Sequence, residues 1–252
     1  MMIILDTGEF FKMTTQHDHA RFSGELATQL KDNLFINTNY RDTVILSITE
    51  HDRAWIRLDQ VPIWNDQQKI PFSFTDYPLL PKITMYKKGI DEVENMNQYA
   101  ALLCSIHYTS FQDIRQSNQK DCIDYIKNEL QRQQQIKSKL PHFNDKVVTQ
   151  HYRLLRFLDE LSLYVCLNQA GVTKNEEHPW FVNGFGTLID DQRYYAEWKS
   201  RSEIKITPFP FKTEFEITLK TKYVPKDLRE KIGINSAYHD TGYTFSTLRI
   251  VG

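Results

Sequence analysis

Residues 154–163 are Leu154-Leu155-Arg156-Phe157-Leu158-Asp159-Glu160-Leu161-Ser162-Leu163. Apolar side chains recur here at the three- and four-residue spacing of a helix that packs against a core, and we expect that helix over residues 147–168. Asp159 falls on the same stripe as Leu155, Leu158 and Ser162. Because an ionised carboxylate is rarely buried without a partner, this Asp indicates a polar site inside the core.

The chain before this helix is also predicted to be helical. The same spacing predicts helices over residues 19–33, 42–58, 83–94, 98–112 and 121–138. Residues 60–82 form a long connection rich in aromatic residues and proline, and long connections are often functional. We expect this segment to be either a lid over the helices or a buried wrapper around them.

After Trp180 the hydrophobic pattern changes to that of strands. Phe215, Ile217 and Leu219 alternate with polar residues, which predicts a half-buried antiparallel strand, and residues 202–211 and 243–251 are its expected neighbours. Two apolar runs around a turn at Gly8 predict an N-terminal hairpin that joins these strands.

We therefore expect a mainly α protein, a helical bundle with a small antiparallel sheet. Residues 1–252 are predicted to form one compact domain, with a helical core over 14–168 and a β-rich cap from 1–13 and 180–252.

Composition limits the possible partners. The 252 residues contain 31 Lys and Arg against 32 Asp and Glu, a net charge of −1, so nucleic acid is not expected as a partner. The three cysteines are an odd number without a CxxC spacing, which is typical of a reducing compartment. The apolar N-terminal run is interrupted by Asp6 and Glu9, and no stretch is long and apolar enough for a membrane span. We expect a cytoplasmic protein without a membrane partner.

Three histidines lie among apolar or small residues on predicted helices, namely His19, His51 and His107. Asp52 lies on the inward stripe of the same helix as His51, and Asp159 on that of a later one. Any single inward His or Asp is more often a hydrogen-bonded core residue than a ligand. Burying each polar group without a partner costs about 1–3 kcal/mol, however, and a shared divalent cation would satisfy all five.

The other histidines have more ordinary settings. His142, His178 and His239 lie in polar or turn-like stretches and are expected at the surface. His151 begins a predicted helix, where a solvated position is the simpler interpretation.

This order of residues resembles the HD superfamily of metal-dependent phosphohydrolases: His19, then the pair His51-Asp52, then Asp159, with His107 as an intervening histidine. The resemblance implies an HD-like helical bundle that holds a divalent ion (Mn, Fe, Mg or Zn) and hydrolyses a small phosphorylated metabolite or a nucleotide. The single intervening histidine favours one metal ion, or a second site that is only partly built from protein.

The resemblance also implies roles for individual residues. Asp52 and His107 are the expected catalytic residues, and His107 either completes the metal shell or orients or protonates the leaving group. Arg21 and Arg53 lie one or two residues from expected ligands and could neutralise the charge of a phosphate. Such neighbours on a helix commonly turn away from the ligand face, which weighs against both arginines.

Several stretches resemble a family of bacterial proteins known only as a domain of unknown function, and the similarity extends over nearly the whole chain. They are Gln16-His17-Asp18-His19-Ala20-Arg21, Glu50-His51-Asp52-Arg53-Ala54-Trp55, Ala100-Ala101-Leu102-Leu103-Cys104-Ser105 and Asp159-Glu160-Leu161-Ser162-Leu163. The resemblance to that family implies no particular reaction. Two alternatives to a hydrolase stay open: an HD-fold iron oxygenase, and a non-catalytic helical module that binds a metal or a small ligand.

Overall fold

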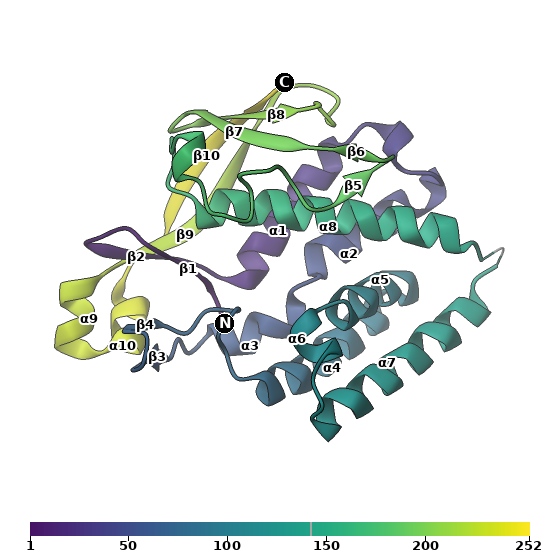
Figure 1. Ribbon diagram of the computed structural model, residues 1–252, viewed down its shortest axis with the longest axis horizontal. Helices are drawn as coiled ribbons and strands as arrows, with labels where there is room; N and C mark the ends of the chain where they lie inside the picture. Colours follow the sequence, from purple (N-terminus) through teal and green to yellow (C-terminus); the bar gives the residue numbers. More distant parts are fainter. Residues whose placement is uncertain (142) are drawn as a thin grey trace.

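The computed structural model describes residues 1–141 and 143–252. A long helix, α8 (Asp145–Leu167), crosses the middle of the molecule, with a sheet on one side and a group of helices on the other (Figure 1). That group is α4 (Leu79–Met96), α5 (Gln98–Thr109), α6 (Gln112–Arg115) and α7 (Lys120–Lys139). Helices α1 (Gln16–Gln29) and α2 (Arg41–Glu50) pack against α8 and against each other.

Side-chain caps fix where several of these helices begin. The Thr15 hydroxyl accepts a hydrogen bond from the Asp18 amide at the start of α1, and the Asn97 side chain accepts one from the Ala100 amide at the start of α5. Asn144 caps α8 in the same way. His19, His107 and Asp159 project from α1, α5 and α8, so each of these caps fixes the start of a helix that carries one of them.

The helix expected over residues 42–58 is broken in its middle. Helix α2 ends at Glu50, and a short 3-10 turn (Arg53–Trp55) and the one-turn helix α3 (Ile56–Asp59) follow. Asp52, at φ −110° and ψ 20°, has left the helical conformation. Adjacent side chains on a regular helix point about 100° apart, so the break allows His51 and Asp52 to face the same point.

The main sheet has six strands in the order β1-β2-β9-β10-β8-β7. The bounds are β1 (Ile3–Asp6), β2 (Phe10–Thr14), β9 (Phe215–Pro225), β10 (Thr244–Val251), β8 (Glu203–Thr207) and β7 (Tyr195–Ser200). Strands β8 and β10 pair in parallel, and all other neighbours are antiparallel. Because β2 pairs with β9, the sheet joins both ends of the chain.

Smaller elements complete the fold. Two short hairpins are formed by β3 (Trp64–Asn65) with β4 (Ile70–Pro71) and by β5 (Leu188–Ile189) with β6 (Gln192–Arg193). Helices α9 (Lys226–Ile232) and α10 (Ile234–Asp240) connect β9 to β10. Short 3-10 turns cover Asp32–Leu34, Thr38–Tyr40 and Lys174–Glu176. None of the helices in the described ranges is long and apolar enough to cross a membrane.

The prediction of a mainly α, HD-like bundle with a small antiparallel sheet is wrong. The chain is about 52% helical, and its six-stranded sheet is curled and mixed, which makes the fold α+β. Strand β7 was not predicted, although its buried Ala196 and Trp198 alternate with exposed residues; the alternation is short, and the large Tyr195 at its start is exposed. Strand β10 follows β9 in the chain but lies between β9 and β8 in the sheet, where it pairs in parallel with β8. Strand alternation carries no information about this order.

Candidate metal centre

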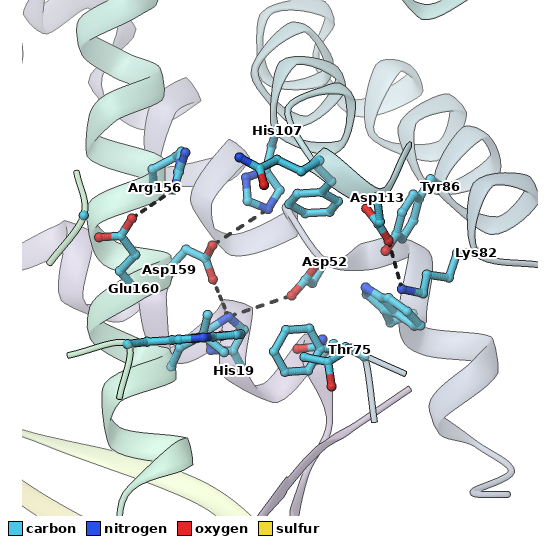
Figure 2. A pocket seen from close by; sticks show the side chains of 18 of the residues that line it. His19, Asp52, Thr75, Lys82, Tyr86, His107, Asp113, Arg156, Asp159 and Glu160 are labelled. Atoms are coloured by element: carbon cyan, nitrogen blue, oxygen red, sulfur yellow. Dashed lines mark hydrogen bonds and ion pairs between the residues drawn. The ribbon is translucent and has the colours of Figure 1, made fainter. Parts of the chain in front are cut away.

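Five side chains from separate parts of the chain meet beside α8. The Nε2 atom of His19 lies 2.9 Å from Asp159 Oδ1 and 3.8 Å from Asp52 Oδ2. His51 Nε2 is 3.5 Å from Asp52 Oδ2 and 3.5 Å from Asp159 Oδ1. His107 Nε2 is 3.8 Å from Asp159 Oδ2. Figure 2 shows His19, Asp52 and His107 arranged around the Asp159 carboxylate.

Close packing of the backbone brings these side chains together. A Cβ atom on Gly24 of α1 would overlap the side chain of Thr49 on α2, so the two helices touch where they carry His19 and His51. A Cβ atom on Gly89 of α4 would lie 2.7 Å from the backbone of Ala54, two residues after Asp52. Glycine is therefore needed at both contacts.

The protonation of His51 follows from its hydrogen bond. Its Nδ1 atom donates to the Ile48 carbonyl over 2.7 Å, so a neutral ring has its lone pair on Nε2. That atom is buried, has no hydrogen-bond partner among residues 1–141 and 143–252, and faces two carboxylate oxygens. A lone pair opposite carboxylate oxygens is repulsive unless a proton or a metal ion lies between them. A backbone carbonyl that holds Nδ1–H is also the usual partner of a metal-bound histidine.

His19 is oriented in the same way. Ser162 Oγ donates to the His19 carbonyl over 3.1 Å, and the same oxygen lies 2.6 Å from His19 Nδ1, so it accepts the proton of Nδ1. The Nε2 atom is left to face Asp159 and Asp52.

The electrostatics of the cluster favour added positive charge. Burial lowers the pKa of His19, but hydrogen bonds and charge interactions with Asp159 and Cys166 together outweigh burial and raise that pKa to about 10. Burial opposes the charged form of His51 as well, yet Asp52 and Asp159 raise its pKa. The imidazoles of His19 and His51 in turn hold the pKa of Asp159 well below its usual range despite burial. The site can be neutralised by protons on His19 and His51, or by a divalent ion in their place.

His107 differs from the other two imidazoles. Burial lowers its pKa to about 3, so the ring is neutral. Its Nδ1 atom is buried without a hydrogen-bond partner in the described part of the chain, and the ring lines a pocket. His107 could therefore be a fifth ligand or a neutral group that contacts a bound molecule.

The donor set suits one ion. Two groups of three residues have ligand atoms within 4.8 Å of one another: His19, His51 and Asp52, and His51, His107 and Asp159. Because both groups include His51, a single shared ion explains the arrangement more simply than two separate ions.

A pocket of about 530 Å³ opens onto this cluster, a volume suited to a small molecule. Its apolar lining is mostly aromatic and includes Trp55, Phe74, Tyr86, Phe111 and Trp180. Two cations also line it. Figure 2 shows Lys82 with Asp113 on one side of the cluster and Arg156 with Glu160 on the other.

The two arginines expected to bind phosphate do not reach this pocket. Arg21 is exposed, and Arg53 forms ion pairs with Glu50 at 3.0 Å and with Glu92 at 2.8 Å. Their positions next to the cluster residues in the chain turn both side chains away from the shared face. Sequence reasoning missed Lys82 and Arg156, which line the pocket instead.

Signals for the missed residues were present in the sequence. Arg156 precedes Asp159 by three residues on one helix, which places both on the same face. Lys82 lies one turn before Tyr86, on the buried stripe of α4.

The remaining histidines lie elsewhere. The expectation of a solvated His151 is wrong, because the ring is fully buried and lies 2.7 Å from the Tyr99 hydroxyl. His239 is exposed, and His178 is half-buried. His142 lies outside the described residues.

The fold and the site together define an α+β protein with a buried His/Asp cluster beneath an aromatic pocket. Residues 2–226 match the family described as Protein of unknown function (DUF3891), and the chain belongs to that family. No curated protein matches the chain, and no solved structure matches it.

Proposed function

We propose that this protein is a metal-dependent hydrolase of phosphoric esters with one divalent ion held by His19, His51, Asp52, His107 and Asp159. The observation that carries the proposal is the Nε2 atom of His51, a buried nitrogen that has no hydrogen-bond partner among the described residues and faces two carboxylate oxygens. Three imidazoles and two carboxylates suit Mn, Fe or Zn better than Mg, which prefers oxygen ligands.

The reaction class comes from the order of these residues in the chain, which resembles that of HD phosphohydrolases. The comparisons name no HD protein, and the fold is not the helical bundle that the resemblance implied. The proposal of HD-type chemistry therefore rests on the ligand pattern and on the pocket beside it, and the expected substrate is a small phosphorylated molecule.

A divalent ion at this position would lower the pKa of a bound water and polarise a phosphoryl oxygen. Burial raises the pKa of Asp52, which suits that carboxylate to accept a proton from the attacking water. The water oxygen bonds to phosphorus, the bond from phosphorus to the leaving oxygen breaks, and Asp52 passes the proton to the leaving oxygen. His107, whose ring is neutral, would help to hold the ion through Nε2 on the side of Asp159. The products are an alcohol and inorganic phosphate.

Phosphate release from a panel of phosphomonoesters and nucleotides tests the proposal. We expect protein loaded with Mn²⁺, Fe²⁺ or Zn²⁺ to release phosphate, and Asp52→Asn to abolish the release. His239→Gln is the matched control, because His239 is exposed and outside the cluster. Tight metal binding without release from any compound would contradict the hydrolase and favour a binding module. Oxygen uptake by the Fe²⁺ form would favour an oxygenase.

A further inference from the structure

The pocket beside the cluster has a fixed aromatic wall. Trp55 contacts Tyr86 edge to face at 5.4 Å between ring centroids, and Tyr86 contacts Phe111 in the same manner at 6.0 Å. Phe111 in turn lies 4.9 Å from the ring of His107. These rings hold one another in place, so the wall offers apolar surface that leads directly to the His/Asp cluster.

Two further rings stand at the mouth of the pocket and come from segments far apart in the sequence. Phe74 and Trp180 meet edge to face at 6.3 Å, and both line the pocket. Trp180 is 53% exposed, which is unusual for so large an apolar side chain with aromatic neighbours.

The segments that carry these two rings are anchored. The Phe74 amide donates to the Met2 carbonyl, and the Asp76 carboxylate accepts from the Ser73 amide in the same turn. Beyond Trp180, the Thr187 amide and hydroxyl both donate to Glu160 on α8. Hydrogen bonds therefore hold both segments at the mouth of the pocket. A flat ring can contact Phe74 and Trp180 without displacing either segment.

The charges in the pocket limit the anion that can bind. Lys82 and Arg156 supply two positive charges, against four carboxylates from Asp52, Asp159, Asp113 and Glu160. One divalent ion balances this difference and leaves no surplus for the several negative charges of a di- or triphosphate. A single phosphate group at the ion adds fewer uncompensated negative charges than a di- or triphosphate does.

Lys82 is placed to contact that phosphate. Its side chain is only 5% exposed, yet it lines the pocket on the Asp52 side of the cluster (Figure 2). Asp113, at 3.3 Å, is the one carboxylate in the described ranges within ion-pair distance of its ammonium group, which carries three donors. The remaining donors are available to an anion bound at the ion.

We propose that this site takes a phosphomonoester whose leaving group is a flat apolar ring, with the ring packed against Phe74 and Trp180 and the phosphate held by the ion and Lys82. This inference rests on the proposed function and narrows its substrate class. It disfavours nucleoside polyphosphates, which need a cluster of cations that the pocket does not provide.

Calorimetric titration of metal-loaded protein with phosphonates tests the inference, because a phosphonate lacks the ester bond and its binding needs no turnover. We expect benzylphosphonate to bind about tenfold or more tightly than methylphosphonate, since each aromatic contact adds a several-fold gain. Trp180→Ala and Phe74→Ala should reduce this preference while leaving methylphosphonate affinity unchanged. Lys82→Gln should weaken both ligands by the same factor.

A matched control and a turnover assay separate the possible outcomes. Phe245→Ala removes an aromatic ring that is 66% exposed and does not line the pocket, so it should leave the preference intact. Equal affinity for the two phosphonates, tighter binding of ATP than of benzylphosphonate, or an unchanged preference in Trp180→Ala and Phe74→Ala would overturn the inference.

If benzylphosphonate binds selectively but benzyl phosphate is not hydrolysed, the pocket assignment stands and the proposed hydrolase fails. If simple phosphoesters are hydrolysed without a ring preference, the hydrolase stands and the pocket assignment fails.

Discussion

Replacing Asp159 with Asn removes one negative charge from the centre of the cluster and leaves the size of the side chain nearly unchanged. The Asp159 carboxylate lies 2.9 Å from His19 Nε2, 3.5 Å from His51 Nε2 and 3.8 Å from His107 Nε2. Because one carboxylate contacts all three imidazoles, this substitution tests the shared site as a unit.

The expected loss of metal affinity follows from Coulomb's law. Two unit charges about 4 Å apart attract by about 4 kcal/mol at an effective dielectric constant of about 20, and a divalent ion loses at least that much. A loss of about 4 kcal/mol raises the dissociation constant of the metal by about a thousandfold.

The same substitution should also lower the stability of the metal-free protein. The pKa of His19 is about 10 in the folded protein, above the value of 6.5 expected when unfolded, so the stabilisation it gives is complete below pH 6.5 and is lost as the pH rises toward 10. Removing Asp159 leaves a buried imidazole without its ionic partner, and we expect the free energy of unfolding at pH 7 to fall by about 3 kcal/mol.

Calorimetric titration of metal-free protein with Mn²⁺ or Zn²⁺ measures the first effect, and urea unfolding measures the second. Wild type and His239→Gln should bind with the same affinity and unfold at the same urea concentration. An unaltered metal dissociation constant in Asp159→Asn would refute the assignment of this carboxylate. Unaltered stability of the metal-free variant would refute its pairing with His19.

Two further predictions concern the surroundings of the site. Gly89→Ala should lower the free energy of unfolding by about 1–3 kcal/mol and weaken metal binding, because its Cβ would lie 2.7 Å from the Ala54 backbone. Thermal unfolding with and without metal checks this, with Gly242→Ala as the control because a Cβ there meets open space. Equal unfolding temperatures of the two variants would contradict the prediction. Burial lowers the pKa of His151 to about 4, below its unfolded value, so stability should fall as pH drops from 6.5 toward 4. In His151→Gln, the free energy of unfolding measured with urea should fall by about 2 kcal/mol less than in wild type between pH 6.5 and pH 4. The same pH dependence in the variant and in wild type would contradict the prediction.

Helical periodicity carried most of the information about the site. It indicated that His19 faces inward on its helix, and the structure places His19 in the cluster. The inward placement of His107 and Asp159 followed from the same reasoning. These side chains lie on regular helices, where spacing along the chain fixes the direction of the side chain.

Features set by long-range packing could not be predicted in this way. The break after His51 depends on the contact between Gly89 and Ala54, two segments that are distant in sequence. Trp180 and Phe74 meet although they are distant in sequence, and hydrogen bonds to Glu160 and Asp76 support their segments.

The sheet shows the same limit. Alternation identified β9, but the mixed order of the six strands depends on a crossover that local patterns do not encode.

Metal content per chain, measured by elemental analysis on purified wild type, His51→Ala and His239→Ala, tests the central claim most directly. The account predicts about one divalent ion per chain in wild type and in His239→Ala, and none in His51→Ala, because a single ion is shared by the five side chains. Wild-type protein that stays free of metal after exposure to Mn²⁺, Fe²⁺ and Zn²⁺, or equal metal content in all three proteins, would contradict it.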